Sequence, residues 1–440
     1  MKIRFYNAKI LSMEPDRDPS KADHKPVLYD GEIRVDGTKI SYAGPGKDPA
    51  GTGEAFDQEI DCGGNVLMPG FKDAHTHSGM TFLRSSADDM PLQSWLNEQV
   101  FPFEAKLTPE DIAVFSKVAI LEYLTGGITS CMEMYLTPES IAKAFQEMGF
   151  RLVQVGSVNS FSQSTELVGQ WYSKLNGVSD LTSFQLGFHA EYTSSRELVG
   201  RIAALADKYK APVFVHVSET AAEVQGCIDR YGKTPVAFLA GEGVFDYGGA
   251  GYHLVHTTED DWRIMKQKHI DVVSNPGSNT KLASGIAPVG DYLRLGIPVA
   301  LGTDGPASNN CLDMFREMFL VTGLGKLREK DASAVPAYEV LKMATYNGAH
   351  VMRQPETDSL AQGKTADLIL LDLNQPNMQP VNNIADNIVY SGSKLNVLLT
   401  MVNGKILYDR LKGPMRFHVG IDASEIYREA NARKKAILGR

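Results

Sequence analysis

The chain has 440 residues, a net charge of −9 and a pI near 5.6. This acidic balance, without a long basic run, argues against a surface that binds nucleic acid or an anionic membrane. No apolar stretch approaches the length of a membrane span, and the N-terminus has neither the apolar run nor the cleavage site of an export signal. Four cysteines without paired spacing indicate a reducing compartment. We therefore expect a cytoplasmic protein that acts on a small molecule.

The two ends of the chain differ in pattern from its middle. Residues 1–67 and about 355–410 carry strand-like pieces with glycine-rich turns, such as the Val-Asp-Gly that ends at Gly37 and the Val-Asn-Gly that ends at Gly404. We expect residues 1–67 and 355–440 to form one small β-sandwich module. Within it, residues 422–440 have the pattern of a charged surface helix, to which no chemistry is assigned.

Residues 68–354 alternate short apolar runs with amphipathic segments, as in repeated strand and helix units around parallel strands. Eight candidate strands lie at residues 65–71, 128–134, 151–157, 185–190, 212–217, 252–256, 271–274 and 298–302. Helical patterns lie at residues 109–127, 138–148, 194–209, 220–232, 259–268, 289–296, 312–327 and 337–352. Eight such units match the size of a TIM-type (β/α)8 barrel, so the predicted fold class is α/β.

The segment PGFKDAHTHSGM, residues 69–80, places two histidines two positions apart after an apolar run. In an extended segment the side-chain period is two, so His75 and His77 point the same way, which suits a shared metal ion. The alternative is a pair of solvated or hydrogen-bonded loop histidines. The rest of the chain has to decide between them.

Other polar residues fall at the ends of predicted strands, where the catalytic groups of such barrels lie. Four residues, His75, His77, His216 and Asp304, form a set of three histidines and a carboxylate that suits Zn²⁺, with Fe²⁺ or another divalent ion as the alternative. Taken alone, His216 could be a core histidine and Asp304 a turn cap. Their coincidence at one end of separate strands favours the metal site. His189, Glu219 and His253 also lie at strand ends.

A family resemblance appears in the motifs PGFKDAHTH, VHVSET, YHLVH, SNPGSNTKLASG and LGTDGPASNN. Together they resemble the amidohydrolase superfamily over nearly the whole length. With PLQSWLNEQVFPFEAKLTPED and FHAEYT, the chain is similar to the methylthioadenosine/S-adenosylhomocysteine deaminases. Guanine deaminases and triazine hydrolases share the same frame, so the motifs specify the superfamily more sharply than the substrate.

The resemblance implies roles for the strand-end residues. The metal ligands would be the four residues named above, and Asp304 would also take up a proton. Glu219 would be the proton shuttle, and His253 would hydrogen-bond the attacking water and then the tetrahedral oxygen. His256 is the rival for that role, since spacing alone does not separate the two.

The resemblance also implies substrate contacts. Glu104 would bind the ribose hydroxyls, His189 would lie on the nucleoside, and Trp95 would line the pocket. The plainer alternatives are a solvated helix-end charge for Glu104 and a core aromatic for Trp95.

Two departures from the family pattern bear on the substrate. Members that accept S-adenosylhomocysteine supply arginines after the third strand, whereas VGSVNSFSQSTELVG, residues 155–169, contains none. S-adenosylhomocysteine is therefore disfavoured. Ser274 replaces a histidine after the seventh strand, and Glu191 stands where many relatives have proline; neither change points to a particular substrate.

The function implied is metal-dependent hydrolytic deamination of a 6-aminopurine nucleoside, such as adenosine, 5′-deoxyadenosine or methylthioadenosine, with release of ammonia. One alternative keeps the chemistry on another ring: guanine, a pterin, a cytosine-like base or a triazine. A non-catalytic scaffold is disfavoured because every expected ligand is present. Assembly into a homo-oligomer is common for such barrels, but no motif here encodes it.

Overall fold

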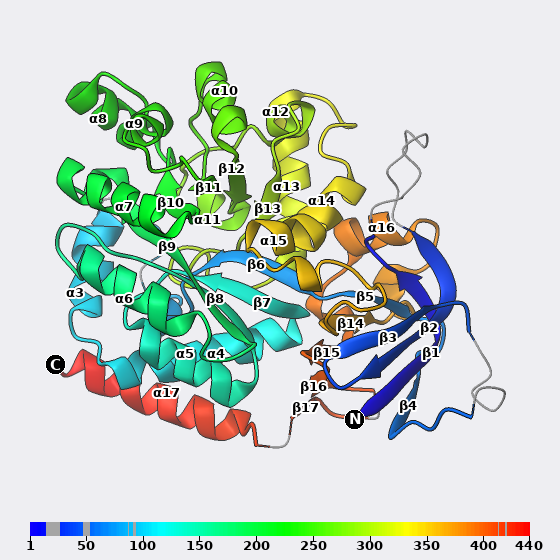
Figure 1. Cartoon of the computed structure of the whole chain (residues 1–440). Coiled ribbons are helices and arrows are strands. Elements are labelled where there is room, and N and C mark those ends of the chain that lie inside the picture. Colours follow the sequence, from blue (N-terminus) through cyan, green and yellow to red (C-terminus); the bar gives the residue numbers. More distant parts are fainter. Residues whose placement is uncertain (15–26, 47–52, 87, 91–93, 412, 419) are drawn as a thin grey trace.

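The computed structural model describes the chain except for residues 15–26, 47–52, 87, 91–93, 412 and 419. Its centre is an eight-stranded parallel sheet that curls into a nearly closed barrel surrounded by helices (Figure 1). The barrel strands are β6 (Phe71–Thr76), β7 (Ile128–Glu133), β8 (Arg151–Val155), β9 (Thr182–Ala190), β10 (Val213–Val217), β11 (Gly249–His253), β12 (Ile270–Ser274) and β13 (Val299–Leu301). A parallel bridge between Thr76 and Asp304 brings the first and last strands together.

Helices alternate with these strands. The α-helices are α3 (Phe101–Glu104), α4 (Pro109–Thr125), α5 (Pro138–Met148), α6 (Thr165–Leu175), α7 (Arg196–Tyr209), α8 (Ala221–Tyr231), α9 (Pro235–Gly241), α10 (Glu259–Lys268), α11 (Pro276–Lys281), α12 (Val289–Arg294), α13 (Met314–Glu329), α14 (Ala337–Ala344), α15 (Tyr346–Val351), α16 (Ile384–Asp386) and α17 (Ala423–Leu438). The 3-10 and π turns are η1 (Ser78–Leu83), η2 (Trp95–Val100), η3 (Glu191–Thr193), η4 (Pro355–Thr357), η5 (Pro376–Met378), η6 (Asn387–Ser391) and η7 (Lys394–Asn396). None of the described helices is long and apolar enough to cross a membrane.

The second unit is a mixed sheet built from both ends of the chain, at the right of Figure 1. Its strands are β1 (Lys2–Leu11), β2 (Leu28–Asp36), β3 (Lys39–Gly44), β4 (Gln58–Asp61), β5 (Val66–Pro69), β14 (Leu368–Leu371), β15 (Val397–Val402), β16 (Lys405–Asp409) and β17 (Arg416–Phe417). The two halves join where β5 pairs with β1 on one side and with β14 on the other. A separate apolar core, which includes Ile3, Phe5 and Leu370, lies against this sheet.

One predicted barrel strand, residues 65–71, is wrong. The apolar run Val66–Pro69 is β5 of the mixed sheet, and the first barrel strand begins only at Phe71. Gly70 separates them: a side chain there would begin about 2.0 Å from the Thr129 side chain, so only glycine lets the chain pass between the two sheets. His75 therefore lies inside the first barrel strand, and His77 directly follows it.

The predicted strand at residues 252–256 is also displaced. The sixth barrel strand is Gly249–His253, and the chain leaves it at His253 and Leu254, whose φ angles are 72° and 47°. Left-handed backbone cannot continue a strand, which is why His256 lies beyond the barrel.

The predicted helix 337–352 is interrupted at Thr345, which separates α14 from α15.

A buried ion network joins the barrel to the mixed sheet. Arg151 of β8 makes a bidentate pair with the Asp367 carboxylate at 2.6 and 3.0 Å, just before β14. Lys72 of β6 is fully buried 4.0 Å from the same carboxylate and donates to the Thr129 hydroxyl at 2.9 Å. Burial lowers the pKa of Lys72 to about 8, because Asp367 only partly offsets the loss of water.

We predict that Asp367→Asn destabilises the fold. The substitution leaves two buried cations without a counter-charge, so the free energy of unfolding should fall by about 3–5 kcal/mol. Urea unfolding followed by circular dichroism measures the change. Glu197→Gln, which removes one partner of an exposed pair with Arg201, is the control and should change stability little. Equal losses in the two variants would show that the buried network is not a stabilising link.

Candidate metal centre and active site

Four side chains converge at the carboxyl ends of the barrel strands. His75, His216, His253 and Asp304 are all buried, and their ligand atoms lie within 4.8 Å of one another. His77 adjoins them, with Nε2 at 3.1 Å from Asp304 Oδ1. The strands thus bring together all four predicted metal-binding residues and add His253 to the group.

Hydrogen bonds on the far side of two rings fix which nitrogen faces the cluster. Nδ1 of His77 contacts the backbone oxygen of Met134, and Nδ1 of His216 lies 2.7 Å from the backbone oxygen of His189. A carbonyl oxygen only accepts, so each Nδ1 carries a proton. The neutral form of each ring therefore turns an unprotonated Nε2 toward the cluster.

Those two Nε2 atoms lie against other side chains of the cluster. Nε2 of His216 lies 3.0 Å from Nε2 of His75, and burial lowers the pKa of His75 to about 3, so that ring is neutral. For His77, burial opposes the charged form, but the Asp304 carboxylate overcomes it and raises the pKa to about 9. A proton there places one positive charge beside the Asp304 carboxylate, where a metal ion would also place positive charge. The donor set therefore fits a metal ion.

The strand ends that hold these groups have unusual backbone angles. Ser218, His253, Leu254 and Asp304 all have positive φ, between 47° and 72°. Residues with side chains rarely adopt this conformation, and its cost is typical of functional sites. Here these residues lie at the ends of β10 and β11 and three positions after β13, and two of them, His253 and Asp304, belong to the cluster.

A single segment after β12 makes hydrogen bonds to three of the predicted site residues. Ser278 donates to Asp304 Oδ2 at 2.6 Å, and Ser284 donates to Glu219 Oε1 at 3.1 Å. Asn279 Oδ1 lies 2.7 Å from Nδ1 of His253. The motif SNPGSNTKLASG contains all three residues, but the sequence alone assigns them no role, since their partners lie on or after three other strands.

Glu219 lies beside the cluster, with its carboxylate 4.0 Å from Nε2 of His253. The backbone that carries it is held by the carboxylate of Glu223, which accepts from the amides of Ser218 and Glu219 at 2.8 Å each. Both Glu219 and His253 are therefore positioned toward the same space. His256 is turned away: its Nε2 contacts the Ser284 backbone oxygen, and it is not part of the cluster.

Two of the three predicted substrate residues lie near this cluster, and the third is buried. His189 ends β9, and its ring centroid lies 5.0 Å from that of His216. Glu104 lies beside Tyr135, whose ring centroid is 6.3 Å from that of His77; burial raises the pKa of Glu104 to about 7. Trp95 is buried, and its indole nitrogen has no hydrogen-bond partner among the described residues.

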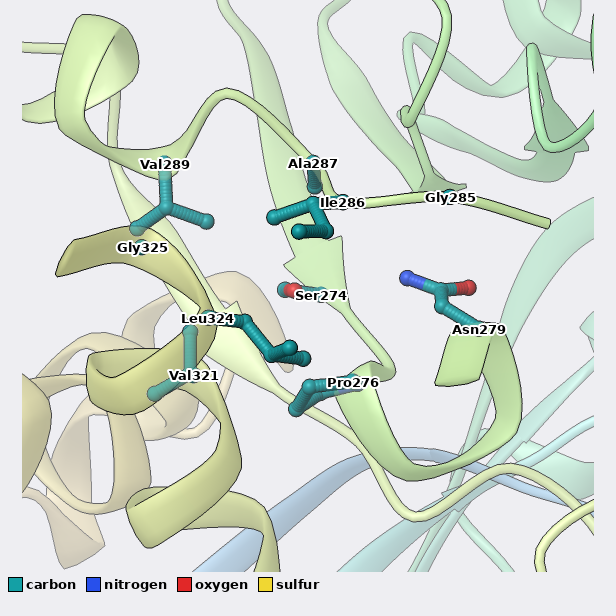
Figure 2. Close-up of a pocket in the computed structure, with 10 residues that line it drawn as sticks. All are labelled: Ser274, Pro276, Asn279, Gly285, Ile286, Ala287, Val289, Val321, Leu324 and Gly325. Carbon is teal, nitrogen blue, oxygen red and sulfur yellow. The ribbon is translucent and has the colours of Figure 1, made fainter. Parts of the chain in front are cut away.

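The two departures from the family pattern, Ser274 and Glu191, are both buried. Figure 2 shows Ser274 and Asn279 among the residues that line a small cavity. Its volume of about 10 Å³ leaves room for about one water molecule and none for a substrate.

Glu191 is buried and forms an ion pair with Arg230 of α8 at 2.7 Å, so its negative charge is balanced within the protein.

Comparison with known proteins identifies the family of the chain. A family model described as "Amidohydrolase family" matches residues 66–407. The chain belongs to the amidohydrolase family. The match covers the barrel and most of the C-terminal strands, and it includes every residue of the cluster.

Full-length relatives narrow the assignment. A 5-methylthioadenosine/S-adenosylhomocysteine deaminase from Syntrophomonas wolfei is 39% identical over 420 residues, which are 93% of this chain and 95% of that protein. The deaminase of the same name from Caldanaerobacter subterraneus is 36% identical over 449 residues, 100% of this chain and 99% of that protein. The predicted resemblance is confirmed.

Solved structures agree on the fold. A zinc-bound adenosine deaminase from Xanthomonas campestris superposes with a TM-score of 0.90 at 29% identity, over 100% of this chain and 98% of that one. An atrazine chlorohydrolase from Arthrobacter aurescens has the same fold, with a TM-score of 0.86 at 20% identity over 98% and 100% of the two chains. The chain is thus an amidohydrolase-superfamily deaminase with a metal site of three histidines and an aspartate.

Proposed function

We propose that this deaminase acts on a 6-aminopurine nucleoside and releases ammonia by hydrolysis. The observation that carries the proposal is the position of Glu219, beside a buried cluster of metal-binding groups, with the carboxyl of Glu104 near Tyr135 and His77. The relatives named as methylthioadenosine/S-adenosylhomocysteine and adenosine deaminases support the substrate class.

We propose one divalent ion, Zn²⁺, with Fe²⁺ as the alternative. Imidazole nitrogens and a carboxylate oxygen are ligands that zinc prefers, and the Xanthomonas adenosine deaminase holds zinc. The ligands would be His75, His77, His216 and Asp304, and His253 would remain free for the substrate. When bound, such an ion lowers the pKa of water to near neutrality and so supplies a nucleophile at C6 of the purine.

Glu219 would move the protons. Its carboxylate accepts one hydrogen bond from Ser284 and keeps free lone pairs toward His253. It takes a proton from the attacking water and delivers it to N1 as the C6–O bond forms. A second proton from the added oxygen goes to the amino group, the C6–N bond breaks, and ammonia and the 6-oxo product result.

His253 would assist the attacking oxygen. Its Nδ1 is held by Asn279, which directs Nε2 toward Glu219. Nε2 accepts a hydrogen bond from the water and, once protonated, stabilises the charge that develops on the tetrahedral oxygen. Asp304, fixed by Ser278, is the second group that takes up a proton.

Among nucleosides, the proposal favours adenosine, 5′-deoxyadenosine and methylthioadenosine over S-adenosylhomocysteine. The loop after β8 offers no arginine for an amino-acid carboxylate. A surface groove lined by Ser160 and Arg201 lies close by, but the Arg201 guanidinium is already paired with Glu166 and Glu197.

We further propose that residues 68–354 act as the catalytic unit and that residues 1–67 and 355–440 fold together as the second. All eight barrel strands lie in the first range, and β5 runs across its first boundary.

We also propose a cytoplasmic location. The four cysteines are free, which is consistent with a reducing compartment.

The proposal predicts a ribose-dependent activity. Ammonia release from adenosine, 5′-deoxyadenosine, methylthioadenosine, S-adenosylhomocysteine, guanine and cytosine should be highest for the first three. Glu104→Ala should lower kcat/KM for adenosine by about 10- to 100-fold, because hydrogen bonds from ribose to a carboxylate are lost. Any activity on guanine should not change. Turnover of a free base alone would overturn the proposal.

The ligand assignment predicts a contrast between two histidines. His77→Ala should lose the metal, whereas His253→Ala should keep it and lose activity. Metal content of the purified variants, measured by plasma mass spectrometry, checks both. His256→Ala is the control and should keep both metal and activity. If His253→Ala lost the metal and His77→Ala kept it, His253 rather than His77 would be the metal ligand.

The proton shuttle predicts a loss of chemistry without a loss of metal. Glu219→Gln keeps the side chain's size but cannot carry a proton, so kcat should fall by about 10²- to 10⁴-fold. Metal content should stay near that of the parent protein. Normal turnover of Glu219→Gln would remove Glu219 from the mechanism.

A further inference from the structure

The C-terminal helix α17 lies against the segment that carries Glu104. In Figure 1 this red helix runs beneath α4, and its end approaches α3. Lys434 of α17 donates from Nζ to the backbone oxygen of Phe82 at 2.6 Å. The same ammonium lies 5.5 Å from the ring centroid of Phe82 and 5.7 Å from that of Phe103. Lys434 therefore contacts the residue that immediately precedes Glu104.

A second set of contacts holds the other side of Glu104. Arg440 donates to the backbone oxygen of Lys106 and to the Asp111 carboxylate, at 2.7 Å each. Arg433 reaches the other oxygen of Asp111 at 3.0 Å. Asp111 is fully buried and caps the start of α4, so these arginines fix the chain directly after α3.

The helical segment that ends at Glu104 is short, and only its first part is buried. α3 (Phe101–Glu104) continues η2 (Trp95–Val100) without a break; Trp95, Leu96 and Val100 are buried in η2, whereas no residue of α3 is. Isolated helices of this length are marginal in water, so tertiary contacts must hold its exposed end, which carries Glu104. Glu104 is the last residue of α3 and is partly buried, and the Lys434 ammonium lies against the ring of the residue before it.

We propose that α17 positions the Glu104 carboxylate for the ribose hydroxyls, with Lys434 as the main positioning residue. The inference rests on the proposed function, because it takes Glu104 as the ribose contact. Lys434 would touch no substrate itself. It would act by holding the Phe103 ring, and hence α3, at the distance from the cluster at which Glu104 reaches a nucleoside whose base lies over Glu219.

The test compares adenosine with 2′,3′-dideoxyadenosine, which lacks both hydroxyls. In Lys434→Met, which keeps the apolar stem but removes the charge and the donor, preference for adenosine should fall by about tenfold, mainly through KM. Lys434→Arg should restore it. Lys435→Met, at an exposed lysine one position along the same helix, is the matched control and should behave as the parent.

A double-mutant cycle separates positioning from general destabilisation. In a Glu104→Gln background, Lys434→Met should have no further effect on the preference for adenosine, because the carboxylate that it positions is gone. Equal losses on both substrates, or the same loss with and without Glu104, would overturn the proposal and leave α17 a purely structural helix.

Hydrogen exchange distinguishes failure of this proposal from failure of the proposed function. Amides of residues 95–107 should exchange faster in Lys434→Met than in Lys435→Met, whatever the substrate. Absence of activity on every 6-aminopurine nucleoside would refute the proposed function. Unchanged exchange in residues 95–107 would refute the positioning role, even in an active enzyme.

Discussion

Convergence of imidazoles and a carboxylate at one rim of the barrel is the constraint on which the active site depends. The ligand atoms of His75, His216, His253 and Asp304 lie within 4.8 Å of one another, and His77 adjoins them. The barrel brings them together because its parallel strands end at one rim, and the backbone at the ends of β10 and β11 and after β13 has positive φ. The fold therefore keeps the ligand atoms close together before a cation binds.

The second level of organisation is the set of hydrogen bonds behind the cluster. Ser278, Asn279 and Ser284 come from one stretch of chain, and each holds a different group: Asp304, His253 or Glu219. One segment can thus keep three groups in register with one another. A shift of this stretch would move all three together, which links their relative geometry to a single element of backbone.

Much of this arrangement could be predicted from the sequence. The alternation of apolar runs and amphipathic segments identified the barrel, because each unit follows local rules of strand and helix periodicity. Strand-end polarity identified His75, His216 and Asp304 as neighbours, since all parallel strands end at one rim. The same reasoning missed the break at Gly70, because a close approach to Thr129 depends on a strand some sixty residues later and leaves no local signal beyond the glycine itself. It also gave no sign that α17 contacts Phe82 and Phe103, since Lys434 is far from both along the chain.

The pairing of β5 with β1 and β14 has a consequence for biosynthesis. The N-terminal strands are complete when the ribosome has made about the first seventh of the chain, but the partner for the open edge of β5 follows the whole barrel. Until β14 emerges, the apolar strand Val66–Pro69 presents unpaired backbone groups to the cell. Pairing of this edge, and with it completion of the mixed sheet, therefore waits for about the last sixth of the chain.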